Sequence, residues 1–297
     1  MQNDTVKKAL ITGGNRGVGK GIVLALAENG YDIAFTYWPA TVEAEEAQHV
    51  KNLVENKWRR RCLAYPAAFE KAQTAQTVVQ QAARDLQGLD VLVNNAATKK
   101  ETGYLYDANP EVIDEYIAVN FRANILTMRE AARYMMLHET HGCILNITSH
   151  RACRTYPGDG IYGSIKAGIS RLSESLALEV APYGIRVNCI APGAIDIRSK
   201  EEYLLEGATP EEIEDRELLG KKVPLGRLGT PADVGNAVVW LASEAASYIT
   251  GVSLRVDGAL FLPGMPETRL APGEEDRGWG HIALKSIEQM RREWLKR

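Results

Sequence analysis

The sequence predicts an α/β fold in which helices cover both faces of one mostly parallel β-sheet. Seven short apolar runs alternate with amphipathic stretches that have the 3.6-residue period of helices. Strands that are joined by helices of this length run mostly parallel to one another. Two of the runs, VLVNN and CILNI, are almost entirely apolar, as central strands buried on both faces require. These observations together indicate a doubly wound domain.

The elements can be placed in order along the chain from these runs. Strands are predicted in KKALITGG, YDIAFTY, RRRCLAYP, LDVLVNNAA, GCILNITS, IRVNCIAPG and VSLRVDGAL. Helices are predicted between them at Gly19–Glu28, Val42–Asn56, Thr74–Leu86, Pro110–Leu137, Tyr162–Ala181 and Ala232–Ala242. Each helix separates two strands, which lets the chain return and begin the next strand in the same direction.

Two segments lie outside this alternation. Residues 198–225 are charged, and we expect helices there that form a lid over the carboxyl edge of the sheet, although a solvated excursion is an alternative. Residues 263–297 form a C-terminal extension that begins with Pro and Gly residues. This extension is predicted to contain an amphipathic helix whose apolar face consists of Ala283, Ile287, Met290 and Trp294. We expect this face to pack on its own domain or on a partner subunit.

Composition and charge exclude several classes of protein. The 297 residues are 45% hydrophobic and 25% charged, unlike disordered, collagen-like or coiled-coil chains. A formal charge of −3 gives no electrostatic basis for binding nucleic acid or an anionic membrane. The first residues lack the pattern of a secretion signal, and no segment supplies about 18 uninterrupted apolar residues. We therefore expect a cytoplasmic protein with a small-molecule ligand.

The cysteine and histidine residues predict neither a disulfide framework nor a metal site. The four cysteines contain no CxxC pair, so they are expected to be core or pocket-lining thiols. His138, His141 and Cys143 lie close together in HETHGC, but no fourth ligand is near. This segment is interpreted as a solvated turn between a helix and a strand.

A glycine-rich loop, TGGNRGVG, follows the first predicted strand and leads directly into a helix. The missing side chains let backbone N–H groups approach a pyrophosphate, and the positive end of the helix stabilises the anion. The alternative is a helix cap and turn without a ligand, but the spacing TGxxxGxG has a low chance frequency in this composition. Binding of a dinucleotide is therefore predicted for Gly13, Asn15, Arg16, Gly17, Val18 and Gly19.

The end of the second strand bears on which nicotinamide cofactor binds. In an NAD site an acidic residue about 20 positions beyond the glycines binds the ribose 2′-hydroxyl. Here the strand ends at Tyr37 and Trp38, without an acid. Arg16 could instead face a 2′-phosphate through its planar guanidinium. NADP(H) is therefore favoured, and NAD(H) remains possible.

Candidate catalytic residues lie in the second half of the chain. Tyr162 and Lys166 are one helical turn apart on the same face of a predicted helix. A YxxxK pair alone is a weak motif, but this one follows a strand that ends at Ser149, which places the serine at the carboxyl edge of the sheet. Asn120 lies inside the preceding helical pattern, where a buried amide needs partners.

In their order and spacing, these residues resemble the short-chain dehydrogenase/reductase family. The similarity covers roughly residues 6 to 260 and is carried by Thr12–Gly19, Asn94–Ala97, Asn120, Ser149, Tyr162 with Lys166, and Pro192 with Gly193. The resemblance implies one Rossmann-type domain over residues 1–262, with a seven-stranded parallel sheet, and a homotetramer. It also implies cofactor contacts from Tyr37, Asn95, Ala96, Tyr162, Lys166, Pro192, Gly193 and Ile195.

The family's chemistry implies a role for each of the four polar residues. Tyr162 would be the acid/base, and Lys166 would hold the nicotinamide ribose and favour the phenolate by its charge. Ser149 would bind the substrate oxygen, and Asn120 would hold a water in the proton relay. Two positions depart from the family's pattern: Ile197 replaces a Thr that bonds the nicotinamide amide, and Ala68 replaces an Asp that contacts adenine.

The segment between Ser149 and Tyr162 should line the substrate pocket because both of its ends are catalytic. His150, Arg151 and Arg154 in this segment favour a hydroxylated or anionic substrate such as a sugar, a polyol or a sugar acid. Alternatively, these side chains point to solvent or to a neighbouring subunit.

The sequence thus predicts an NAD(P)(H)-dependent oxidoreductase that acts on a carbonyl or a secondary alcohol. Reduction of a 3-oxoacyl thioester is an alternative with the same chemistry. An alternative of another class is a non-catalytic binding protein that senses a nucleotide. Such a protein would not need all four of the polar residues Asn120, Ser149, Tyr162 and Lys166.

Overall fold

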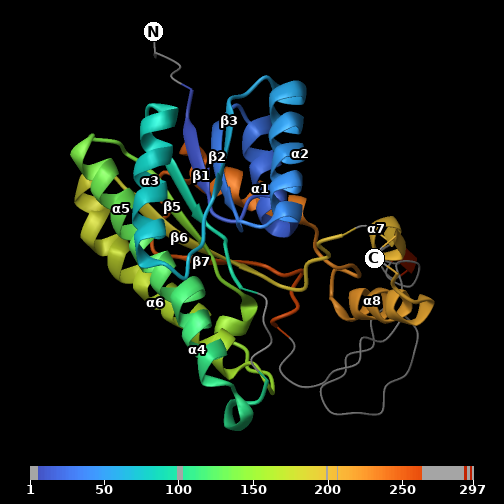
Figure 1. Ribbon diagram of the computed structural model, residues 1–297. Helices are drawn as coiled ribbons and strands as arrows, with labels where there is room; N and C mark the ends of the chain where they lie inside the picture. The colour runs from blue at the N-terminus through green and yellow to red at the C-terminus, as the bar shows by residue number, and fades with distance from the viewer. Residues whose placement is uncertain are drawn as a thin grey trace.

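The computed structural model contains one seven-stranded sheet, and all of its neighbouring strands run parallel (Figure 1). It describes residues 6–98, 103–198, 200–205, 207–262, 291–292 and 295. The strand order is β3-β2-β1-β4-β5-β6-β7, with β1 at Lys8–Ile11, β2 at Asp32–Tyr37, β3 at Cys62–Pro66, β4 at Val91–Asn94, β5 at Cys143–Ile147, β6 at Arg186–Pro192 and β7 at Ser253–Val256. The predicted fold class and all seven predicted strands are confirmed.

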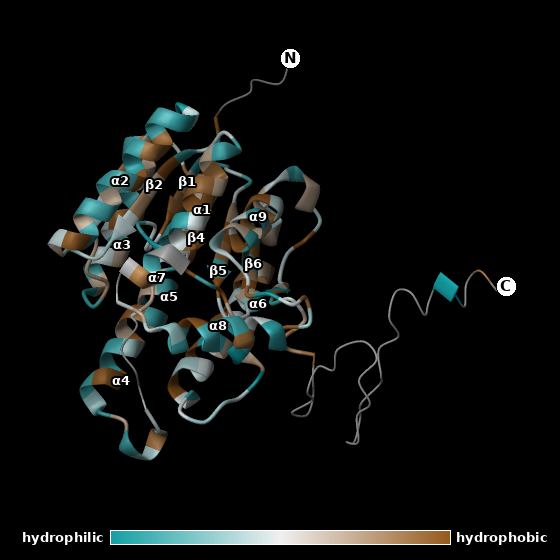
Figure 2. Ribbon diagram, turned by 90° about the vertical axis from the view of Figure 1, so that its right-hand side faces the viewer, coloured by the Kyte–Doolittle hydropathy of each residue, from teal (hydrophilic) through white to brown (hydrophobic). Residues whose placement is uncertain are grey.

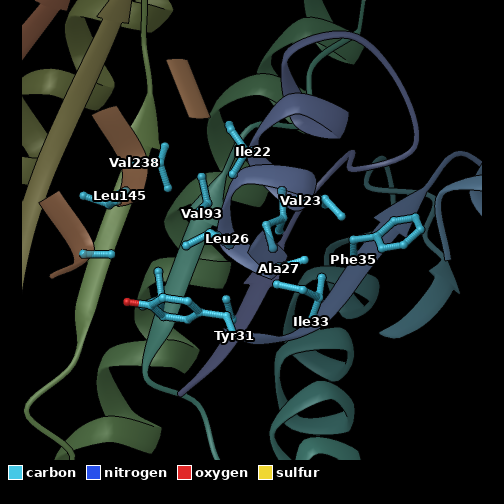
Figure 3. Packing of buried hydrophobic residues seen from close by; sticks show 14 of the residues in the cluster. Ile22, Val23, Leu26, Ala27, Tyr31, Ile33, Phe35, Val93, Leu145 and Val238 are labelled. Carbon is cyan, nitrogen blue, oxygen red and sulfur yellow. The ribbon is translucent and has the colours of Figure 1, made fainter. Parts of the chain in front are cut away.

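Helices cover both faces of the sheet (Figure 1). Helices α1 (Gly17–Glu28), α2 (Thr41–Trp58) and α9 (Pro231–Ala242) pack on one face, and α3 (Ala72–Leu86), α5 (Ala123–Leu137) and α6 (Gly160–Val180) pack on the other. The apolar side chains of each strand alternate between the faces, as Ile33 and Phe35 do against Ala34. Figure 3 shows Val23 of α1 on the side of Phe35 of β2, and Ile22 of α1 on the side of Val93 and Val238.

Helix α2 lies at the outside of its layer, next to β2 and β3. Figure 2 shows α2 as mostly hydrophilic beside the hydrophobic strands β1 and β2. Its buried residues are Glu43, Ala47, Val50 and Val54. The last three follow the spacing of a core-facing helix stripe. Glu43 is the exception, because a carboxylate is rarely buried without a partner.

One predicted helix is interrupted where Asn120 lies. The pattern Pro110–Leu137 predicts a continuous helical segment, but the structure contains α4 (Pro110–Tyr116), a π-helical turn at Ile117–Arg122, and then α5. Such turns widen the helix by one residue and occur mostly at functional sites. The hydrophobic period cannot show this insertion, because the residues on both sides of it stay apolar.

The two segments outside the alternation differ in how far the structure describes them. Residues 198–225 contain α7 (Lys200–Leu205) and α8 (Pro210–Lys222), the helices expected for a lid. The apolar stripe predicted at residues 283–294 lies outside the described residues. Over the part of the chain that is described, none of the helices has both the length and the hydrophobicity needed to cross a membrane.

The sheet places its ligand-binding edge next to β1. The chain moves outward from β1 to β2 and β3 on one side, and then continues with β4 on the other side. At such a reversal a crevice opens beyond the carboxyl ends of the strands. The loops after β1, β4 and β5 all meet there, and they carry the glycine loop, Asn95 and Ser149.

Helices α1 and α9 approach each other so closely that only glycine fits at the contact. A Cβ atom on Gly21 would lie 2.4 Å from the Cβ of Pro231 and 2.6 Å from its carbonyl oxygen. A Cβ atom on Gly235 would lie 2.7 Å from the carbonyl oxygen of Gly21. The two helices therefore depend on both glycines to pack.

We expect Gly21→Ala to lower the free energy of unfolding by about 1–3 kcal/mol, because the added methyl group forces the two helices apart. Gly160→Ala in α6 is the matched control, since a Cβ atom there meets nothing within 4 Å. Urea unfolding of both variants measures the difference. Equal stability of the two variants would contradict the close α1–α9 contact.

Candidate active site

A cavity of about 670 Å³ lies at the carboxyl edge of the sheet. Its wall is formed by the loops that follow β1 to β6 and by the start of α6. The predicted cofactor and catalytic residues on this wall are Gly13, Asn15, Arg16, Gly17, Val18, Gly19, Tyr37, Asn95, Ala96, Ser149, Tyr162, Lys166, Pro192, Gly193 and Ile195. The structure thus brings together residues from both halves of the chain.

The glycine loop has the shape needed to hold a diphosphate. Gly13 and Gly17 have φ angles of 68° and 53°, which favour glycine. A Cβ atom on Gly19 would lie 1.9 Å from the carbonyl oxygen of Gly13, so no side chain fits between this loop and the first turn of α1. Helix α1 begins at Gly17 and directs its unpaired N–H groups towards the cavity. These features fit the pyrophosphate of a dinucleotide.

Hydrogen bonds hold the glycine loop against the chain after β4. The Thr12 hydroxyl accepts from the backbone N–H groups of Asn95 and Ala96 at 2.9 and 3.0 Å. The Asn95 amide donates to the carbonyl oxygens of Thr12 and Gly13 at 3.0 and 2.9 Å. The side chain of Asn95 is therefore a brace between two loops, a role that sequence reasoning did not assign.

Tyr162 and Lys166 project from the first turns of α6 into the cavity, where Ser149 approaches from β5. Lys166 is 4% exposed, and its Nζ donates to the Ile147 carbonyl oxygen at 2.8 Å. This Nζ lies 5.7 Å from the centre of the Tyr162 ring. The three side chains therefore line one wall.

Burial dominates the titration of these groups. It raises the pKa of Tyr162, while a hydrogen bond from Ser149 and the charge of Arg151 act in the opposite direction. Burial also lowers the pKa of Lys166 to about 8. At neutral pH the phenol therefore carries its proton, and the ammonium is close to losing one.

Asn120 lies behind the cavity wall and is completely buried. Its Oδ1 accepts from the Thr98 backbone N–H at 2.8 Å, and its carbonyl oxygen accepts from the Asn124 amide at 2.8 Å. Its Nδ2 has no hydrogen-bond partner among the described residues. An amide in this state satisfies its donors best through a bound water.

His150, Arg151 and Arg154 are not among the residues that line the cavity, so their contact with a substrate stays a prediction. His150 Nδ1 lies 3.1 Å from the Pro192 carbonyl oxygen, and Arg154 donates to the Leu260 carbonyl oxygen at 2.9 Å. Arg151 pairs with Asp159 at 3.3 Å. A short helical turn at residues 150–152 carries His150 and Arg151, and a linear sequence pattern cannot show that turn.

The environment of Arg16 also differs from the expectation. Its Nη1 lies 2.6 Å from Oε1 of Glu43, a residue in the first turn of α2. The Asn15 amide donates to the other oxygen of Glu43 and to Glu46, the latter at 2.9 Å. Glu43 lines the cavity, although no acid stands at the end of β2. The guanidinium predicted to face a 2′-phosphate is therefore already paired.

Sequence reasoning missed further residues of the cavity wall. They are Thr36, Trp38, Glu43, Ala67, Phe69, Glu70, Ala97, Thr98, Glu115, Val119, Ile147 and Thr148. Thr98 donates to Glu115 at 2.9 Å, so a carboxylate is part of the cavity wall. Among the residues that follow β3 and β4, the sequence motifs indicated only Ala68 and Asn94–Ala97 as positions near a cofactor.

The predicted lid is anchored beside the cavity. Asp196 follows β6 and pairs with Arg216 of α8 at 2.5 Å. The guanidinium of Arg216 also lies 4.1 Å from the centre of the Tyr203 ring of α7. Both helices are thereby tied to the loop that carries Ile195 and Ile197, two residues of the cavity wall.

Comparison with known proteins identifies the family. A family model described as enoyl-(acyl carrier protein) reductase matches residues 13–260. A short-chain dehydrogenase/reductase from Armillaria gallica is 32% identical over 254 residues, covering 85% of this chain and 95% of that protein. L-rhamnose-1-dehydrogenase from Scheffersomyces stipitis is 30% identical, covering 86% and 96%. The 3-oxoacyl-(acyl-carrier-protein) reductase from Staphylococcus epidermidis is 31% identical, covering 86% and 99%.

Solved structures agree with this assignment. Acetoin dehydrogenase from Salmonella typhimurium has a TM-score of 0.78 at 28% identity, covering 89% of this chain and 99% of that one. ElxO with NADP bound has a TM-score of 0.76 at 26% identity, covering 87% and 100%. The chain therefore belongs to the short-chain dehydrogenase/reductase family of NAD(P)-dependent oxidoreductases, and the resemblance seen in the sequence is confirmed.

The burial of Lys166 makes stability depend on pH. The folded state releases this proton at about pH 8, and the unfolded chain releases it at the ordinary value of 10.5. Between these pH values the unfolded state holds more protons, so stability rises with pH. From pH 7 to pH 10 we expect the wild type to gain roughly 2–3 kcal/mol relative to Lys166→Met.

Urea unfolding at the two pH values measures this gain. Lys222→Met, at an exposed position of α8, is the control and should show no such change relative to the wild type. A constant difference between the wild type and Lys166→Met would show that the ammonium is well solvated.

Proposed function

We propose that this member of the short-chain dehydrogenase/reductase family transfers a hydride between NAD(P)(H) and the carbonyl or secondary-alcohol carbon of a small polar substrate. The observation that carries the proposal is the presence of Ser149, Tyr162 and Lys166 on the same cavity wall as the glycine loop. A binding protein that only senses a nucleotide would need the loop alone.

The residues of the cavity divide the binding of the dinucleotide between them. The glycine loop and the N-terminus of α1 bind the pyrophosphate. Lys166 lies beside the catalytic pair, where its ammonium can bind the nicotinamide ribose. When bound, the nicotinamide supplies or accepts the hydride.

Tyr162 and Ser149 act on the oxygen of the substrate. In the direction of reduction, the Tyr162 hydroxyl gives its proton to the carbonyl oxygen as the hydride reaches the carbon, and an alcohol forms. The raised pKa of Tyr162 keeps this proton in place at neutral pH. The Ser149 hydroxyl donates a hydrogen bond to the same oxygen, orienting the substrate and stabilising the developing charge.

Asn120 and Lys166 support the return of the proton to Tyr162. The unpartnered Nδ2 of Asn120 lies in a fully buried position behind Thr98, where a water can bind it. With its pKa near 8, Lys166 can pass protons at physiological pH. We propose that a water near Asn120 connects this ammonium to solvent.

A sugar- or polyol-like substrate is favoured by polar groups on the cavity wall that Ser149 also lines. Thr98 and Glu115 give the wall hydroxyl and carboxylate oxygens, which suit a hydroxylated ligand. Among the relatives, the enzyme from Scheffersomyces stipitis is an L-rhamnose-1-dehydrogenase. The alternative substrate is a 3-oxoacyl thioester, as the relative from Staphylococcus epidermidis indicates. Ile195 and Ile197 on the other side of the cavity are compatible with an acyl chain.

Assembly and location stay predictions. Large apolar side chains are exposed on several helices, among them Leu137 of α5, Leu178 of α6 and Trp240 of α9. Because singly exposed apolar side chains also occur on monomers, the proposed homotetramer rests on the family resemblance. We retain the proposed cytoplasmic location.

Tyr162→Phe should reduce kcat by about 10²–10⁴-fold while the Kd for the cofactor changes little, because only the transferred proton is lost. Initial rates from the absorbance of reduced nicotinamide and cofactor titration by fluorescence measure the two quantities. Tyr248→Phe, at a fully exposed position, is the control and should behave as the wild type. Near-normal turnover by Tyr162→Phe would refute the assignment of the acid/base.

A substrate panel separates the two substrate classes. We expect kcat/KM for sugars, polyols or small hydroxyketones to exceed that for 3-oxoacyl thioesters by at least about tenfold, because an apolar chain offers no hydrogen bonds to the polar side chains of the wall. The wild type is assayed with both cofactors in both directions. A preference for the thioesters would transfer the assignment to 3-oxoacyl reduction.

A further inference from the structure

Helix α2 brings into the cavity the carboxylate that β2 lacks. Glu43 is 9% exposed and lies on the cavity wall between the glycine loop and Trp38. Its two oxygens are engaged by Arg16, at 2.6 Å, and by the Asn15 amide. A buried carboxylate held by two side chains of the glycine loop is a built feature of the cavity.

The position of this carboxylate relative to a bound dinucleotide follows from the rest of the site. The N-terminus of α1 would hold the pyrophosphate, and Tyr162 and Lys166, which line the same cavity beyond β5, would hold the nicotinamide half. The adenosine half therefore extends in the opposite direction, towards β2 and α2. Glu43 stands where the adenosine ribose meets the wall.

The charges at this end are unfavourable for an added phosphate. Arg16 is matched by Glu43, and Glu46 adds a second carboxylate that also accepts from Asn15. Asn15 thus directs its amide N–H groups to carboxylates and has none to offer an anion. The other cation on the described cavity wall is Lys166, which donates to the Ile147 carbonyl oxygen at the far end.

NAD(H) and NADP(H) differ only at the 2′ position of the adenosine ribose. The 2′-hydroxyl of NAD(H) is neutral and can donate a hydrogen bond to a carboxylate. The 2′-phosphate of NADP(H) carries negative charge and accepts hydrogen bonds, so a carboxylate repels it and cannot bond it. In a partly buried site water screens this repulsion less than at the surface.

We infer that Glu43 selects NAD(H) over NADP(H). The inference rests on the proposed function, and it reverses the preference for NADP(H) that Arg16 alone predicts. That prediction requires a free guanidinium, and Arg16 is held by Glu43. If Arg16 turned to a 2′-phosphate, Glu43 would keep only the hydrogen bond from Asn15 and would face a second anion without a compensating charge.

Titration of the full-length protein with NADH and with NADPH tests the inference, with nicotinamide fluorescence as the readout. We expect the wild type to bind NADH at least about tenfold more tightly than NADPH. Glu43→Gln keeps an oxygen for Asn15 and removes the charge, so this preference should fall by about tenfold, mainly through tighter binding of NADPH. Glu45→Gln makes the same charge change on an exposed position of α2 and should leave the preference unchanged.

The outcomes separate this inference from the function on which it rests. Tighter binding of NADPH by the wild type overturns the inference, and so does an equal loss of preference in Glu45→Gln. In both cases the oxidoreductase assignment stands, because a nicotinamide cofactor binds. Binding of neither cofactor overturns the proposed function and the inference together. The wild-type preference is measured without any variant, and an unchanged preference in folded Glu43→Gln also overturns the inference.

Discussion

The close approach of the glycine loop to the first turn of α1 is the contact on which the rest of the site depends. Gly19 leaves no room for a side chain beside the Gly13 carbonyl oxygen, and Thr12 and Asn95 join this loop to the chain after β4 by four hydrogen bonds. With the loop fixed in this way, the N-terminus of α1 faces the crevice at the reversal of strand order. The direction of a bound dinucleotide then follows, since one end lies towards β2 and the other towards β5.

A second constraint holds the catalytic helix against the sheet. Asn94 of β4 donates to Asn146 of β5 at 2.9 Å and accepts from Thr127 of α5 at 2.7 Å, and Asn146 donates to Ser173 of α6 at 2.8 Å. Each of these side chains is buried, so each would cost stability if its partner were absent. The chain of hydrogen bonds sets how α5 and α6 lie on the two central strands. It therefore sets the distance between Ser149 at the end of β5 and Tyr162 on α6.

The sequence predicted those parts of the site that depend on short spacing along the chain. The glycine loop, the YxxxK pair and Ser149 at the end of a strand are local patterns, and the seven strands follow from apolar runs. The differences lie where direction in space matters. His150, Arg151 and Arg154 follow the serine, but their side chains contact Pro192, Asp159 and Leu260 and are not among the residues that line the cavity. Glu43 was missed because its approach to Arg16 depends on how α2 packs against β2, which no motif encodes.

The charged groups in and beside the cavity differ from one end to the other. At the adenosine end, Glu43 and Glu46 outnumber the single guanidinium of Arg16. In the middle, backbone N–H groups of the glycine loop meet the pyrophosphate without a charged side chain. At the nicotinamide end, Lys166 is buried beside Tyr162. A buried ammonium destabilises the fold, as its lowered pKa shows. The same exclusion of water strengthens its attraction for electron-rich oxygens. Residues Ile165 and Ile169, buried on both sides of it in α6, hold the helix in place and so keep this charge where the chemistry needs it.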